Sequence, residues 1–158
     1  MAQLLPTAEV LVVTTPQLAA AEVAERAGSL AVQTHQRVAG VVENMAFLPC
    51  PHCGPDHRLE IFGSGGGARV AAGLSRILGA SVPLLGTVPV DVALREGSDA
   101  GVPLVLSEPD APASVVLLAS FLTSNLPSDR CVRTAVSSNL TRPSFSRPPL
   151  STAWWCVS

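Results

Sequence analysis

The chain has 158 residues, which is typical of a single domain, and 47% of them are hydrophobic while only 14% are charged. This composition excludes intrinsic disorder for most of the chain. A formal net charge of −2 and a pI near 5.9 argue against a nucleic-acid-binding protein, which is normally basic.

The first half of the chain alternates apolar runs with a helical pattern. Residues 9–14 (EVLVVT) form a β-branched run that predicts a strand buried on both faces, and residues 37–43 (RVAGVVE) predict a second buried strand. The alanine-rich residues 18–30 between them predict a helix. Residues 44–60 follow no regular pattern, so we expect them to be irregular.

A second helix is expected after the glycine-rich residues 63–67 (GSGGG). Its apolar face would consist of Val70, Ala71, Leu74, Ile77 and Leu78. Gly79 stands where a helix favours glycine at its C-terminus.

The remaining elements continue the alternation. Residues 83–88 predict a third strand, residues 103–106 a further strand, and residues 112–122 a final helix. Such an order predicts an α/β fold with a mainly parallel sheet and flanking helices. From about residue 125 the chain is rich in serine, proline and arginine and has no period, so residues 125–158 are predicted to be a disordered tail.

No membrane span or secretory signal is expected. The longest strongly apolar stretch, residues 113–122, is about half as long as a bilayer requires, and the first basic residue is only Arg26. We therefore expect a cytoplasmic protein with no membrane partner.

Cys50 and Cys53 form a CxxC pair, the sharpest chemical signal in the chain. Two thiolates at this spacing bind one metal ion or one edge of a cluster. His52 or His57 could complete a zinc site, or a two-fold axis could join the pairs of two copies. A thioredoxin-like redox pair is disfavoured because no helical pattern follows Cys53. The pair could also be two loop cysteines without a ligand.

Other polar positions are weaker signals. The glycines of residues 63–67 could bind an anion, but close packing of the following helix is the favoured interpretation. They do not form a Walker A loop, because the chain contains no lysine. Asn44 reads as a turn or cap residue, and Asp91 as a helix cap.

Four segments together resemble one family. They are VLVVTTPQLAAAEVAERAG (10–28), VAGVVENMAFLPCPHCG (38–54), IFGSGGGARVA (61–71) and VPLLGTVPVD (82–91). Their order and spacing resemble the C-terminal portion of the Mrp/ApbC-type iron–sulfur cluster carriers, P-loop ATPases related to the MinD/ParA group. The resemblance covers roughly residues 3–122.

The resemblance implies a partial P-loop NTPase fold, with residues 1–124 as its C-terminal lobe. It implies a homodimer in which Cys50 and Cys53 of each copy hold a bridging [4Fe–4S] cluster for delivery to apo-proteins. ATP and Mg²⁺ regulate the transfer in the family. By the same resemblance, Asn44, Pro89 and Asp91 lie on the nucleotide-base side.

The family's Walker A loop and magnesium ligands lie upstream of the matching segments. We therefore expect that this chain alone does not hydrolyse ATP. Without the P-loop strand, residues 9–14 would form an open apolar sheet edge, which predicts low solubility. Two alternatives stay open: a truncated, non-functional product, and a zinc-stabilised binding module that uses the CxxC pair.

Overall fold

Three parallel strands form the central sheet of the computed structural model, which describes residues 8–123. The strands are β1 (Val10–Thr14), β2 (Val38–Glu43) and β5 (Leu84–Thr87), in the order β1-β2-β5. Each pairs in parallel with its neighbour, as the apolar runs predicted. The predicted disorder of residues 125–158 lies outside the described residues.

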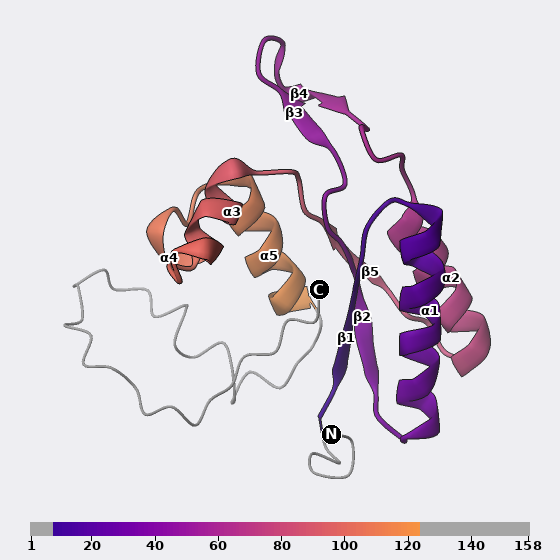
Figure 1. The fold of residues 1–158 in the computed structure, drawn as a ribbon. Coiled ribbons are helices and arrows are strands. Elements are labelled where there is room, and N and C mark those ends of the chain that lie inside the picture. The colour runs from indigo at the N-terminus through magenta and orange to yellow at the C-terminus, as the bar shows by residue number, and fades with distance from the viewer. Residues whose placement is uncertain (1–7, 124–158) are drawn as a thin grey trace, which may run out of the picture. The chain divides into compact units, whose positions relative to one another are not determined.

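Helices cover the sheet on both faces. On one face lie α1 (Leu18–Gln33) and α2 (Gly66–Leu78). On the other face lies α5 (Pro112–Thr123), together with α3 (Val92–Asp99) and α4 (Leu104–Ser107) (Figure 1). These layers confirm the predicted α/β fold with flanking helices. None of the helices within residues 8–123 is long and apolar enough to cross a membrane.

The core lies on both sides of β2, whose residues are all buried. Val41 packs in one cluster with Val70 and Leu74 of α2, and Val42 belongs to the cluster of the opposite face. The prediction that the first strand is buried on both faces is wrong, because Val13 in β1 is 44% exposed. The reason is that α5 packs over β5, and of β1 the cluster on that face includes Leu11 but not Val13.

Three further predictions are wrong. Residues 44–60 are not irregular: they contain an antiparallel hairpin of β3 (Leu48–Cys50) and β4 (Gly54–Leu59). Residues 103–106 are not a strand, because Pro103 precedes the one-turn helix α4 and its carbonyl accepts hydrogen bonds from the backbone of Leu106 and Ser107. Ile77, expected on the apolar face of α2, is 49% exposed.

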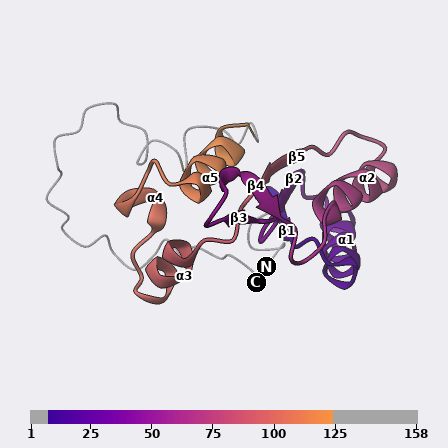
Figure 2. The same cartoon turned by 90° about the horizontal axis from the view of Figure 1, so that it is seen from above.

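The β3–β4 hairpin projects from the carboxyl end of the sheet, between β2 and α2 in the chain (Figures 1 and 2). Its base is braced by the guanidinium group of Arg58, which lies 4.3 Å from the ring centroid of Phe47. A cation–π contact of this kind joins β4 to the segment that leads into β3. This contact stabilises the base of the hairpin, which carries the tip.

Candidate metal centre

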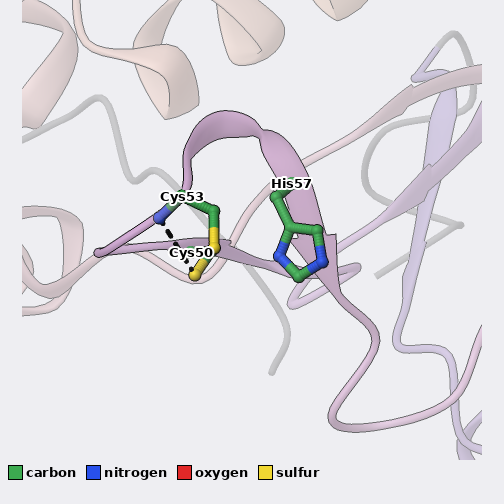
Figure 3. Close-up of side chains that lie close together, drawn as sticks. All are labelled: Cys50, Cys53 and His57. Atoms are coloured by element: carbon green, nitrogen blue, oxygen red, sulfur yellow. Dashed lines mark hydrogen bonds between the residues drawn. The ribbon is translucent and has the colours of Figure 1, made fainter.

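The tip of the hairpin brings together Cys50, Cys53 and His57 (Figure 3). One ligand atom of each residue, the two sulfurs and an imidazole nitrogen, lies within 4.8 Å of the other two. Both cysteines are free thiols, Cys50 half-buried and Cys53 exposed. His57 is exposed as well. Two sulfurs and one imidazole nitrogen are a donor set suited to zinc or an iron–sulfur cluster rather than to Mg²⁺ or Ca²⁺.

The turn that joins the strands decides which residues meet. Pro49 pairs with Arg58 across the hairpin, and the register shifts between Pro49 and Cys50, so that Cys50 pairs with Gly54. Gly54 closes this tight turn with a φ of 91°, a left-handed conformation that favours glycine. The turn folds Cys53 back toward Cys50, while β4 returns His57 to the same level of the hairpin.

The local hydrogen bonds shift the pKa values of the two thiols in opposite directions. The backbone N–H of Cys53 donates to the sulfur of Cys50 across 3.4 Å. Hydrogen bonds from the backbone of His52 first, then from Cys53 and from the side chain of His57, lower the pKa of Cys50 to about 6. The pKa of Cys53 is raised, first by its hydrogen bond with Cys50 and then by desolvation. Cys50 is therefore the more nucleophilic sulfur near neutral pH.

Of the two histidines that the sequence offered as a third ligand, His57 is the one placed beside the cysteines. His52 lies in the turn between the two cysteines, and its backbone N–H is directed at Cys50. The sequence left this choice open because it depends on the strand pairing.

The residues expected on the nucleotide-base side lie at the carboxyl ends of the strands. The N–H of Asn44 donates to the carbonyl of Thr14 (2.7 Å), and the side-chain oxygen of Asn44 accepts from the N–H of Met45 (2.9 Å). Pro89 is buried beside this segment, where the N–H of Val90 donates to the carbonyl of Phe47 (2.8 Å). The segment that follows Asn44 thus runs beside the segment that contains Pro89.

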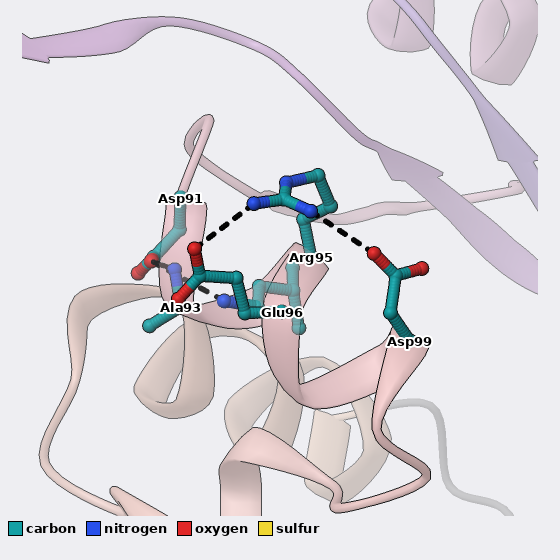
Figure 4. A network of polar contacts seen from close by, with 6 residues as sticks. Asp91, Ala93, Arg95, Glu96 and Asp99 are labelled. Atoms are coloured by element: carbon teal, nitrogen blue, oxygen red, sulfur yellow. Dashed lines mark hydrogen bonds and ion pairs between the residues drawn. The ribbon is translucent and has the colours of Figure 1, made fainter.

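Asp91 caps α3, as the sequence predicted. Its carboxylate accepts hydrogen bonds from the N–H groups of Ala93 (2.8 Å) and Leu94 (3.4 Å) (Figure 4). These bonds satisfy backbone N–H groups in the first turn of α3, so Asp91 has a structural role at this position.

The last two glycines of the glycine-rich segment serve close packing. Gly66 and Gly67 are buried at the start of α2, and the carboxylate of Glu43 accepts a hydrogen bond from the N–H of Gly67. The negative charge that the helix N-terminus attracts is therefore supplied by the chain itself. Sequence reasoning missed Glu43, although an acidic residue that ends a buried apolar strand could have pointed to it.

Several iron–sulfur cluster carrier proteins are similar in sequence. The protein of Mycobacterium leprae is 58% identical over 118 residues, which cover 75% of this chain and 30% of that protein. The protein of Mycobacterium tuberculosis is 62% identical over 111 residues (70% and 28%), and that of Synechocystis is 40% identical over 119 residues (75% and 32%). The chain thus spans about a third of the length of these relatives.

The chain is also similar to a solved structure and to the sequence pattern of a protein family. The septum site-determining protein MinD of Pyrococcus horikoshii, solved with Mg-ADP, has a TM-score of 0.51 and 16% identity, and the match covers 82% of this chain and 44% of MinD. At this identity the likeness shows the fold alone. Residues 1–122 match the sequence model described as NUBPL iron-transfer P-loop NTPase within the ParA group. The chain therefore belongs to the family of ParA-type, NUBPL iron-transfer P-loop NTPases.

Proposed function

We propose that this chain belongs to an iron–sulfur cluster carrier and that the hairpin tip holds the cluster as cargo. The observation that carries the proposal is the pair of free thiols, Cys50 and Cys53, on an accessible turn. Thiolates are the usual ligands of iron–sulfur clusters. The similarity to carrier proteins of several organisms supports the same role.

The cargo we propose is a [4Fe–4S] cluster shared by two copies of the chain. Such a cluster is normally held by four cysteine thiolates, whereas one hairpin supplies two. A two-fold axis through the hairpin tips would double the pair without any new residue. The hairpin projects beyond the sheet (Figure 1), so its tip is accessible to the hairpin tip of a second copy.

Exposure of the site suits delivery to apo iron–sulfur proteins. A recipient's thiolates must approach the cluster irons, and Cys53 at the turn lies open to solvent. A free dithiol also requires a reducing compartment, so we infer a cytoplasmic location.

We further propose that Asn44, Pro89 and Asp91 border a nucleotide base. The support is their position at the carboxyl ends of parallel strands, where α/β folds bind ligands. Pro89 is buried and Asp91 caps α3, so contacts from this turn would come from its backbone. The chain has no lysine, so it does not itself supply a P-loop lysine for the phosphates.

The test of the cluster proposal is anaerobic reconstitution of the 158-residue chain with iron and sulfide. We expect the broad visible absorption of a [4Fe–4S] cluster, about two irons and two sulfides per chain, and a dimer. Cys50→Ser with Cys53→Ser should abolish all three signals. Cys131→Ser with Cys156→Ser is the matched control and should abolish none of them.

A cluster that forms equally well without Cys50 and Cys53, or no cluster at all, would overturn the proposal.

A further inference from the structure

The third donor at the hairpin tip, His57, has no part in a cluster held by four cysteines. Its imidazole nitrogen nevertheless lies within 4.8 Å of both Cys50 Sγ and Cys53 Sγ (Figure 3). The three side chains come from one hairpin of one chain. A single copy therefore has three soft or borderline ligands around one point.

The spacing fits a mononuclear tetrahedral site after a small closure. Zinc bonds of about 2.3 Å to sulfur and about 2.0–2.1 Å to nitrogen place neighbouring ligand atoms roughly 3.5–3.8 Å apart. The three atoms here, all within 4.8 Å, need to approach by at most about 1.3 Å to meet that geometry. Cys53 and His57 are exposed, so rotation of their side chains toward the metal meets little packing resistance.

We propose that one chain binds a single Zn²⁺ ion through Cys50, Cys53 and His57, with the fourth position open to water or to a donor from another molecule. The inference rests on the proposed function only in sharing its two cysteines. Because the same thiolates cannot ligate both, the mononuclear ion and the cluster exclude each other on one hairpin. The zinc form needs one copy of the chain, whereas the proposed cluster needs two.

The test uses Co²⁺ as a spectroscopic probe in the 158-residue chain with Cys131→Ser and Cys156→Ser, so that the thiols come from the hairpin alone. Titration should produce sulfur-to-cobalt charge transfer and the visible bands of tetrahedral Co²⁺, which Zn²⁺ should then bleach. His57→Ala should weaken Zn²⁺ binding at least about 100-fold, because loss of an outer-shell partner alone costs 10–100-fold. His52→Ala, on the same turn, should leave affinity and spectrum unchanged.

A further variant separates ligation from a structural role. His57→Cys supplies a third sulfur, so it should restore tight binding with stronger charge-transfer absorption. Equal Co²⁺ affinity and spectra in the His57→Ala and His52→Ala chains would overturn the proposal, as would weak binding by His57→Cys in a chain whose circular dichroism is native.

Reconstitution with iron and sulfide distinguishes this inference from the cluster proposal. His57→Ala should keep the cluster absorption, which depends on the thiolates alone. If no cluster forms but the chain still binds Zn²⁺, the proposed carrier function is contradicted and the zinc site stands. If the cluster forms but Zn²⁺ binding does not depend on His57, the zinc site is contradicted and the proposed carrier function stands.

Discussion

The carboxylate of Glu43, at the end of β2, accepts a hydrogen bond from the backbone N–H of Gly67 in the first turn of α2. Glu43 is only 4% exposed, and Gly67 is buried. The contact joins the central strand to the helix that follows the hairpin. Its electrostatic component is favourable, because a helix N-terminus carries partial positive charge.

Removal of this acceptor should destabilise the fold. Glu43→Ala leaves a buried N–H without its partner, which should lower the free energy of unfolding by about 1–3 kcal/mol. Glu43→Gln keeps an acceptor oxygen and should lose less. Urea denaturation followed by circular dichroism measures both, and equal losses in the two variants would show that the hydrogen bond is not the cause.

Gly66 should not tolerate a side chain. A Cβ atom there would lie 2.4 Å from the carbonyl oxygen of Thr15 and 2.8 Å from that of Pro16, and backbone atoms cannot rotate away. We expect Gly66→Ala to cost about 1–3 kcal/mol, as overpacked sites do. Ala68→Ser, at an exposed position of the same turn, is the control. Equal thermal midpoints for the two variants would contradict the close approach.

Loss of the Asp91 cap should weaken α3 (Figure 4). Asp91→Ala should lower stability by about 1 kcal/mol, and Asp91→Asn should recover most of it. Asp99→Ala removes only the exposed ion pair with Arg95 and should change stability by less than about 0.5 kcal/mol. A larger effect of Asp99→Ala than of Asp91→Ala in chemical denaturation would reverse this order.

The two thiols of the hairpin should differ in their pH dependence. In reduced, metal-free protein, alkylation of Cys50 by iodoacetamide should reach half its maximal rate near pH 6 and level off at higher pH, once the thiol is fully ionised, because the thiolate is the nucleophile. Alkylation of Cys53, whose pKa is raised, should continue to accelerate at higher pH.

Peptide mass spectrometry resolves the two alkylation rates. In urea both thiols should titrate near about 8.5, the value of an unperturbed cysteine. Identical pH profiles for Cys50 and Cys53 in the folded chain would refute the hydrogen-bond pattern at the turn.

The free edge of β1 predicts self-association. Within residues 8–123, β1 pairs only with β2, and Val13 on it is 44% exposed. Exposed apolar edges template strand pairing between molecules, so Val13→Lys should reduce aggregation measured by light scattering. Val23→Lys makes the same change at a 64% exposed position of α1 and should help less. A monodisperse, monomeric parent chain would contradict the prediction.

The regular elements could be predicted because their signals are local. The β-branched runs marked β1 and β2, and Gly79 marked the end of α2, where it adopts a φ of 65°. The hairpin was not predicted, because β3 has three residues, one of them Pro49, and shows no alternation of apolar and polar residues. The strand predicted at residues 103–106 failed because its apolar residues serve a one-turn helix.

The sequence by itself determined the alternating α/β order, the paired thiols of Cys50 and Cys53 and the cap at Asp91, because each depends on residues close together in the chain. Only the tertiary structure decided that His57 rather than His52 joins the cysteines and that Glu43 meets Gly67. The first depends on the register of the hairpin, and the second on how β2 packs against α2. A local pattern of residue types encodes neither the strand register nor the packing of separate elements.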